Sequence, residues 1–207
     1  MDESVRLAMK KWPNVPAAYH WLSLDRRGRW LLEGRLLRHE RTIAFIARNY
    51  LCDEHGAWYF QNGPQKVFVA LAYTPWVYHL AGGRNAGSPG SLLSHTGIEV
   101  QRIVSSWMDQ EGSLLLETEL GIGVLDDRDL DALTSCMLDE DGQPLTDREL
   151  ADRIERLMSQ DAETVIVLGY GEQRVAVRPI RAGEVPQRFG FIQNPQPAAD
   201  DSAPTPA

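Results

Sequence analysis

Residues 57–78 hold the side chains that best suit contact with a ligand, because aromatic rings stand there beside amide and ammonium groups. This mixture is typical of a small-molecule or peptide pocket, in which rings supply contact area and polar donors fix orientation. The same composition also fits an ordinary sheet core that ends in a tight turn. The pocket interpretation assigns ligand binding to Trp58, Asn62, Gln65, Lys66, Tyr73 and Trp76.

Acidic and basic groups that could catalyse a reaction follow no recognised catalytic pattern. The sequence contains no H-E-x-x-H, C-x-x-C or G-x-S-x-G, and no two histidines are spaced as metal ligands on a helix. An enzyme would have to assemble groups such as His39, Asp53 and His55 from distant positions. The sequence therefore predicts no metal and no cofactor, and it leaves catalysis open as an alternative to binding.

A glycine-rich stretch at 82–91 is the candidate for a phosphate-binding loop, and it fails the test. Such a loop needs a lysine after its last glycine and a strand-to-helix setting. No lysine follows Gly87, and no strand-to-helix pattern surrounds it. The stretch is therefore predicted to be a linker or loop between two lobes.

Four turns share the pattern Asp-x-x-Gly, which supplies a side-chain acceptor at the start of the turn and a residue tolerant of positive φ at its end. They are Asp25–Gly28, Asp53–Gly56, Asp109–Gly112 and Asp139–Gly142. Similar strands follow the first and third turns, at 29–33 and 113–117, and each copy reaches its second turn about one helix later. This order predicts an internal duplication, and the alternative is that four common turns arose independently.

Hydrophobic periodicity indicates the elements that position these residues. Helices are predicted at 3–12, 36–50 and 127–137, and a fourth begins at Thr146 with a capping box that ends at Glu149. Strands are predicted at 19–24, 29–32, 57–60, 67–73, 98–107, 114–120, 164–169 and 174–180. We therefore expect an α+β fold with two related hairpin-helix-hairpin lobes and a mostly antiparallel sheet.

The distribution of charge supports a division into two lobes. Residues 1–80 carry 11 Lys and Arg against 7 Asp and Glu, whereas residues 81–207 carry 10 against 22. The predicted domains are a basic lobe at 1–81, the linker at 82–91, an acidic lobe at 92–194 and a disordered tail at 195–207. The positive balance of the first lobe suggests that an anionic ligand meets Lys66 and the arginines at 26, 27, 29, 38 and 41.

Composition excludes several classes of partner. The net charge of −8 argues against nucleic acid, whose binding requires neutralisation of phosphates. No apolar run approaches the ~20 residues that cross a bilayer, and the first residues lack a signal-peptide pattern. We therefore expect a cytoplasmic protein that binds neither nucleic acid nor membrane. Its two cysteines, Cys52 and Cys136, are predicted to be reduced core residues.

The first half of the sequence resembles bacterial domain families of unknown function. The resemblance rests on Asp25-x-x-Gly28-x-Trp30, the helix after His39, Gly56-x-Trp58-Tyr59 and the segment 62–67. It extends over about residues 19–180, and it implies a bacterial cytosolic setting without bringing any catalytic residue.

Three functional hypotheses follow from these observations. The leading one is a non-catalytic binding or regulatory module for a small anionic or peptide-like ligand, bound near the aromatic hairpin of the first lobe and the groove between lobes. The second is an enzyme with an acid–base site assembled from distant residues. The third is an adaptor that forms a homodimer through a sheet edge.

Overall fold

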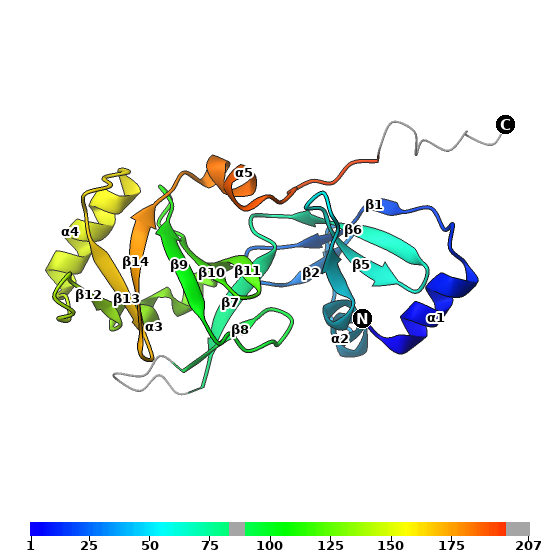
Figure 1. Cartoon of the computed structure of the whole chain (residues 1–207), viewed down its shortest axis with the longest axis horizontal. Helices are drawn as coiled ribbons and strands as arrows, with labels where there is room; N and C mark the ends of the chain where they lie inside the picture. Colours follow the sequence, from blue (N-terminus) through cyan, green and yellow to red (C-terminus); the bar gives the residue numbers. More distant parts are fainter. Residues whose placement is uncertain (83–89, 198–207) are drawn as a thin grey trace. The chain divides into compact units, whose positions relative to one another are not determined.

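The chain has a mixed α+β fold with two sheets that are mostly antiparallel, as predicted (Figure 1). The structure, a computed structural model, describes residues 1–82 and 90–197. Most of the expected linker at 82–91 and of the expected tail at 195–207 lies outside the described residues. Within the described segments, no helix is both long and apolar enough to cross a bilayer.

The chain divides into two compact units. Unit 1 contains Met1–Asp25, Arg29–Tyr73 and the segment that begins at Gly190, and unit 2 contains Arg26–Gly28 and Thr74–Phe189. The division therefore falls between Tyr73 and Thr74, whereas the sequence placed it at the glycine-rich stretch. The tip of the first hairpin, Arg26–Gly28, belongs to unit 2.

Unit 1 is built on one six-stranded sheet. Its helices are α1 (Glu3–Lys11) and α2 (Glu40–Arg48), and its strands are β1 (Ala18–Leu24), β2 (Trp30–Leu32), β3 (Arg35–Leu36), β4 (Tyr50–Cys52), β5 (Trp58–Asn62) and β6 (Gln65–Leu71). The strand order is β3-β2-β1-β6-β5-β4, and β1 and β6 are parallel neighbours. Because β6 lies inside the sheet, the apolar run predicted as a central strand does occupy that position.

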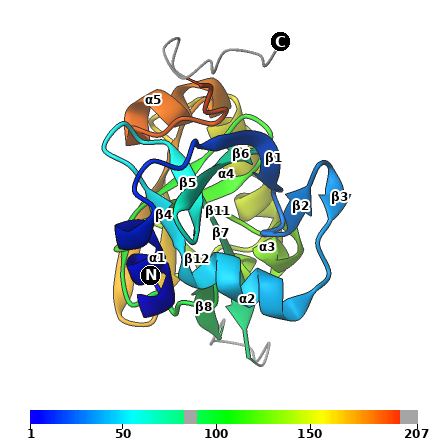
Figure 2. The ribbon, with the colours of Figure 1, turned by 90° about the vertical axis from the view of Figure 1, so that its right-hand side faces the viewer.

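Helix α2 packs on the sheet of unit 1, and its first residues explain where it begins (Figures 1 and 2). The N–H of Thr42 donates to Nδ1 of His39, which caps the helix and fixes its start four residues later than predicted. Ile46 is buried, and the ring of Phe45 meets that of Phe60 edge to face at 5.4 Å. These contacts cover one face of the sheet with aliphatic and aromatic side chains.

Unit 2 is built on an eight-stranded sheet. Its strands are β7 (Trp76–Ala81), β8 (Ser91–Ser94), β9 (Ile103–Met108), β10 (Leu114–Thr118), β11 (Gly121–Leu125), β12 (Met137–Leu138), β13 (Ile166–Tyr170) and β14 (Gln173–Pro179). Its helices are η1 (Asp127–Asp129), α3 (Leu130–Thr134), α4 (Asp147–Met158), η2 (Ala182–Glu184) and α5 (Val185–Phe189). The strand order is β12-β13-β14-β9-β10-β11-β7-β8, with parallel pairs at β14–β9 and β11–β7.

Helix α4 lies beside β13 and β14 in unit 2 (Figure 1). The capping box predicted from sequence is present: Thr146 accepts the N–H of Glu149, and the Glu149 carboxylate accepts the N–H of Thr146. Leu150 and Leu157 are buried on the inward face of the helix. The cap and the apolar face together explain why this helix was the most readable one in the sequence.

Six strands of each unit follow the same order. The order β3-β2-β1-β6-β5-β4 of unit 1 corresponds to β11-β10-β9-β14-β13-β12 of unit 2. Each set has one central parallel pair, β1–β6 or β9–β14, and each has a helix, α2 or α3, after its third strand in the chain. Unit 2 adds α4 between β12 and β13, and adds β7 and β8 at the β11 edge.

The Asp-x-x-Gly turns share one hydrogen-bonding scheme. Asp53 Oδ1, for example, accepts the N–H groups of His55 and Ala57, which lie two and four residues later. The turns at 109 and 139 repeat both hydrogen bonds, and the turn at 25 repeats the second. The four turn glycines have positive φ of 74°, 83°, 79° and 77° in chain order, so the turn prediction is confirmed.

The two cysteines occupy different environments. Cys136 is buried in unit 2, as expected, whereas Cys52 is exposed at the end of β4. The prediction that Cys52 is a core residue is therefore wrong. It failed because the helix that was expected to run to residue 50 ends at Arg48, and β4 then carries Cys52 to the end of an edge strand.

We expect Gly56→Ala to destabilise the protein more than Gly142→Ala, although both glycines have positive φ. A β-carbon on Gly142 meets no heavy atom within 4 Å, so only the left-handed conformation is penalised, by about 1 kcal/mol. A β-carbon on Gly56 collides with the carbonyl oxygen of Gly190 and comes within 3.1 Å of the Phe191 Cα. Displacing this main chain should cost roughly 1–3 kcal/mol more.

Urea unfolding of the two variants measures the difference directly. Gly142→Ala is the matched control, because it changes the same turn position without a collision. Equal losses of unfolding free energy would show that the contact between the second turn and Gly190 is absent or soft.

Candidate functional site

Three of the six residues predicted to bind a ligand meet in the β5–β6 hairpin of unit 1. Asn62 pairs with Gln65 across the hairpin, and Lys66 is the next residue of β6. The Lys66 ammonium nitrogen lies 4.8 Å from the centroid of the Tyr59 ring. Gln65 donates from Nε2 to the carbonyl of Pro16 at 3.0 Å.

The other three predicted residues lie elsewhere. Trp58 begins β5, at the end opposite Asn62, and its ring lies 4.8 Å from that of Tyr50. Tyr73 is buried at the last position of its segment in unit 1. Trp76 belongs to unit 2, where its ring lies 5.5 Å from that of His95.

Two of the three residues named for an acid–base site accept hydrogen bonds from backbone N–H groups. His39 caps α2, and the Asp53 carboxylate closes its own turn. His55 is exposed beside Glu54. Within residues 1–82 and 90–197, no group of three or more histidine, cysteine, aspartate or glutamate side chains is arranged to hold a metal ion.

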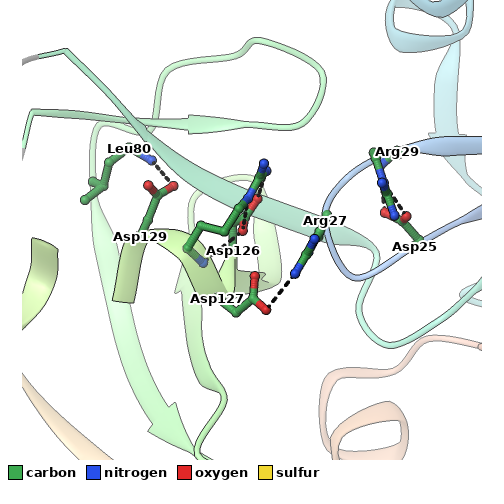
Figure 3. A network of polar contacts seen from close by, with 8 residues as sticks. Asp25, Arg27, Arg29, Leu80, Asp126, Asp127 and Asp129 are labelled. Carbon is green, nitrogen blue, oxygen red and sulfur yellow. Dashed lines mark hydrogen bonds and ion pairs between the residues drawn. The ribbon is translucent and has the colours of Figure 1, made fainter. Parts of the chain in front are cut away.

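Three arginines that were expected to meet an anionic ligand are paired with acidic side chains. Arg27 lies 3.2 Å from Asp127 within unit 2, and Arg29 lies 2.7 Å from Asp25 within unit 1 (Figure 3). The third, Arg26, reaches Glu111 at 3.5 Å. These pairs use part of the positive charge that the sequence assigns to the first lobe.

Asp126 and Asp129, also drawn in Figure 3, have structural roles. Asp129 accepts the backbone N–H of Leu80 at 2.9 Å. Asp126 is 2% exposed and accepts both the backbone N–H and the guanidinium of Arg128. Burial alone would raise the pKa of Asp126, but the hydrogen bonds and charge of Arg128 outweigh burial and lower it to about 2.

A groove of about 680 Å³ lies over the central parallel pair of unit 2, and it was not predicted from the sequence. We call it the β9–β14 groove. Its walls come from the beginnings of the two strands, and its lining residues are Gln101, Arg102, Ile103, Val104, Ser105, Gln173, Arg174, Val175, Ala176 and Arg178. All of them belong to unit 2.

The groove opens where the two parallel strands have not yet paired. The ladder between β9 and β14 begins at Ser106 and Val177. Ahead of it, the Gln173 side chain bridges the strands: its Oε1 accepts the N–H of Ile103 at 2.9 Å and its Nε2 donates to the carbonyl of Gln101 at 3.1 Å. A side-chain amide thus satisfies backbone groups that a continuous ladder would have paired.

Three arginines line the β9–β14 groove. Arg174, Ala176 and Arg178 are spaced two residues apart along β14, so their side chains lie on the same face of the sheet. Arg178 lies over the ring of Trp107, 5.7 Å from its centroid. The third arginine is Arg102. In the part of the chain that the structure describes, no carboxylate lies within 4.0 Å of any of the three guanidinium groups as an ion pair.

Two carboxylates lie close to the groove, and protein groups hold both of them. Glu117 accepts the hydroxyl of Ser105 at 2.6 Å. Glu119 accepts the backbone N–H groups of Gln101 and Arg102 at 2.7 and 3.0 Å. Burial would raise the pKa of Glu119, but these N–H donors and the Arg102 charge lower it below its usual range. The guanidinium groups therefore keep donors available for an anion.

Unit 1 fills the corresponding surface with aromatic rings. The register places Val69 opposite Leu22 in β1–β6, as it places Val177 opposite Ser106 in β14–β9. The position of Ala176 in unit 2 is therefore that of Phe68 in unit 1. The Phe68 ring stacks on Tyr19 at 4.7 Å and meets Tyr59 at 5.9 Å.

One sequence signal, used together with the turns, could have located the groove. The pattern Gln-basic-Val-x-Val occurs at 65–69 and again at 173–177, with Lys66 matched by Arg174 and Phe68 by Ala176. In both copies the glutamine donates to a backbone carbonyl two residues before the neighbouring strand. The predicted residues Gln65 and Lys66 are thus the unit 1 counterparts of two residues that line the groove.

We expect Asp126 to make folding dependent on acid pH. Its pKa is about 2 in the folded protein and near 3.8 when unfolded, so its contribution is complete above pH 4 and is lost as the pH falls through 2. The shift corresponds to about 2 kcal/mol. Urea unfolding at several pH values should show that Asp126→Asn loses about that much less stability over this range. The surface variant Asp131→Asn is the control, and equal pH dependence in all three proteins would contradict the assignment.

Comparison with known proteins gives a family and a fold. Two solved structures are similar to this chain. A DUF1285 family protein from Silicibacter pomeroyi DSS-3 is 14% identical, with 83% of this chain and 86% of that chain covered and a TM-score of 0.50. A DUF1285 family protein from Shewanella baltica OS155 is 17% identical, with 55% and 87% covered and a TM-score of 0.39.

At 14% identity the similarity to the Silicibacter protein concerns the fold alone. No curated protein matches the chain. The family model DUF2944, described as "Protein of unknown function (DUF2946)", matches residues 1–196. Because this match covers nearly the whole sequence, the chain belongs to that family of proteins of unknown function.

Proposed function

We propose that this chain is a non-catalytic binding module that holds a small anionic ligand in the β9–β14 groove of unit 2. The observation that carries the proposal is the set of three guanidinium groups, Arg102, Arg174 and Arg178, around a groove of about 680 Å³. That volume falls within the range of roughly 300–1,000 Å³ typical of small-molecule sites.

Arginine is the side chain best suited to hold an anion in this setting. Its planar guanidinium presents a fork of donors that matches carboxylate and phosphate oxygens, and it stays charged at every physiological pH. Arg174 donates from one nitrogen to the carbonyls of Gly171 and Gln173, which holds its stem along the strand. This anchoring reduces the entropy that the side chain loses when a ligand binds.

The sequence-based site in unit 1 remains part of the proposal as a second contact region. Asn62, Gln65 and Lys66 form its polar hairpin, whereas Trp58 and Tyr73 lie elsewhere in unit 1 and Trp76 belongs to unit 2. The correspondence of Lys66 with Arg174 supports a cationic contact at the same position of each unit. A peptide-like anion and a bacterial cytosolic setting also remain proposals.

An internal duplication accounts best for the relation between the units. Its support is the shared order of six strands, the shared turn geometry and the repeated Gln-basic-Val-x-Val pattern. In this interpretation, the two copies kept the central parallel pair and diverged on the surface above it. Unit 1 has rings at this surface, and unit 2 has small side chains and arginines.

We expect wild-type protein to bind pyrophosphate, and the double variant Arg174→Gln/Arg178→Gln to bind it at least tenfold more weakly at low salt. The difference should shrink as salt rises from 20 to 200 mM, because screening at about 0.1 M already weakens charge interactions beyond roughly 10 Å. Isothermal titration calorimetry at both salt concentrations measures the affinities.

The comparison variant is Arg41→Gln/Lys66→Gln, which removes the same charge from unit 1, where Lys66 belongs to the second contact region. Pyrophosphate affinity that falls only in this variant would move the site to the first unit. Affinity that no variant changes, or no binding by wild-type protein, would refute an anion site in the groove.

A further inference from the structure

We propose that the ligand of the β9–β14 groove is a flat ring-bearing organic acid whose ring takes the place that aromatic side chains fill in unit 1. This inference rests on the proposed anion site and adds the chemical class of the ligand. It comes from comparing the same surface in the two units of one chain.

The two units differ in the shape of the surface above their central parallel pairs. In unit 1, the rings of Tyr19 and Phe68 stack nearly parallel, with an interplanar angle of 12°. The counterpart of Phe68 in unit 2 is Ala176, which contributes a methyl group in place of a ring. Unit 1 therefore shows that a ring packs well above the start of the central parallel pair, and unit 2 leaves that space open to solvent.

The neighbouring position of the first strand differs in the same direction. Trp21 directly precedes Leu22, the residue opposite Val69, and Ser105 directly precedes Ser106, the residue opposite Val177. A large aromatic side chain in unit 1 thus corresponds to a hydroxymethyl group in unit 2. Small residues at both positions enlarge the groove at the place where unit 1 carries rings.

Cationic side chains pack over aromatic rings in both units. In unit 1, the ammonium of Lys66 lies over the Tyr59 ring, 4.8 Å from its centroid. In unit 2, Arg178 and Arg188 lie 5.7 and 4.1 Å from the centroid of Trp107, so guanidinium groups already pack against a ring beside the groove. A guanidinium stacks on a flat ring with one face while its edge donates to an acid. Arg174 is the counterpart of Lys66, and the nitrogen that donates to the carbonyls of Gly171 and Gln173 is only one of its three guanidinium nitrogens.

The groove is larger than an inorganic anion and has a partly apolar lining. A volume of about 680 Å³ far exceeds what one inorganic anion fills. Part of the lining is apolar, since Val104, one of the lining residues, is 48% exposed. Apolar lining next to arginines fits a ligand with one apolar face and one acidic group better than it fits a bare phosphate.

Calorimetric titration with four probes tests this class of ligand. The probes are naphthalene-2-carboxylate, adenosine 5′-monophosphate, cyclohexanecarboxylate and inorganic phosphate. Naphthalene-2-carboxylate and adenosine 5′-monophosphate are the two ring acids, because each carries a flat aromatic ring. We expect at least one of them to bind tenfold or more tightly than both phosphate and cyclohexanecarboxylate, the saturated acid. The better of the two ring acids identifies the acidic group as a carboxylate or a phosphate.

The variant Ala176→Phe copies the side chain of unit 1 into the groove. It should weaken binding of the ring acid at least tenfold and leave the affinity for phosphate within twofold, because Arg174 and Arg178 are retained. Ala151→Phe, on the exposed face of α4, is the matched control and should bind like the wild type. Circular dichroism and thermal melts establish that each variant is folded.

The outcomes separate the two proposals. If the saturated acid and phosphate bind as tightly as the ring acids, or if Ala176→Phe leaves ring-acid affinity unchanged, the ligand class is wrong while the anion site stands. If none of the four probes binds, the ligand class is wrong, and the anion site is also wrong if pyrophosphate fails to bind.

Discussion

The parallel pairing of two strands from different hairpins is the constraint on which each unit depends. In unit 1, β1-β2-β3 and β4-β5-β6 are each joined by antiparallel neighbours, and only β1–β6 unites the two groups into one sheet. The pair β9–β14 unites the corresponding groups of unit 2. Without it, each sheet would divide into two smaller sheets, and each of these would have an additional open edge.

The candidate site is a consequence of how this pair begins. A parallel ladder between strands of different hairpins has no turn to set its first residue, so the strands can approach each other gradually. In both units a glutamine amide at the start of the second strand reaches the main chain of the first, through Gln65 or Gln173. The surface above this junction must then be filled by side chains or left open. Phe68 fills it in unit 1, and Ala176 leaves it open in unit 2.

Local features of the fold could be predicted from the sequence because their determinants are local. The Asp-x-x-Gly turns, the capping box at Thr146 and the class of the fold depend on residues a few positions apart, and all three are confirmed. Strands β7, β8 and β11 were missed, as were the short strands β3, β4 and β12. Apolar residues in β7 were taken for part of an aromatic recognition segment, and β8 and β11 lie beside glycine-containing stretches that resemble loops.

The groove could not be predicted by the same reasoning, because it depends on contacts that are distant in sequence. Its arginines come from residues around 102 and from β14, and only the parallel register brings them together. The groove is also open because Ala176 has no aromatic ring. This difference is recognised only by comparison with unit 1, where Phe68 supplies a ring at the same position. The aromatic segment at 57–78 suggested a pocket because its rings are present, yet Tyr59 packs against Phe68 within the segment and Trp58 packs against Tyr50.

His95 and Asp126, whose pKa values lie far below their usual ranges, have structural roles. Burial lowers the pKa of His95 to about 3, and its Nδ1 accepts the N–H of Val77, so the imidazole serves the fold as a neutral group. The low pKa of Asp126 has an equally structural cause in Arg128. A general acid or base works best with a pKa near the ambient pH and with access to substrate, and neither group meets these conditions. The proposed anion site instead relies on arginines, whose charge never changes at physiological pH and which would hold an anion without exchanging protons with it.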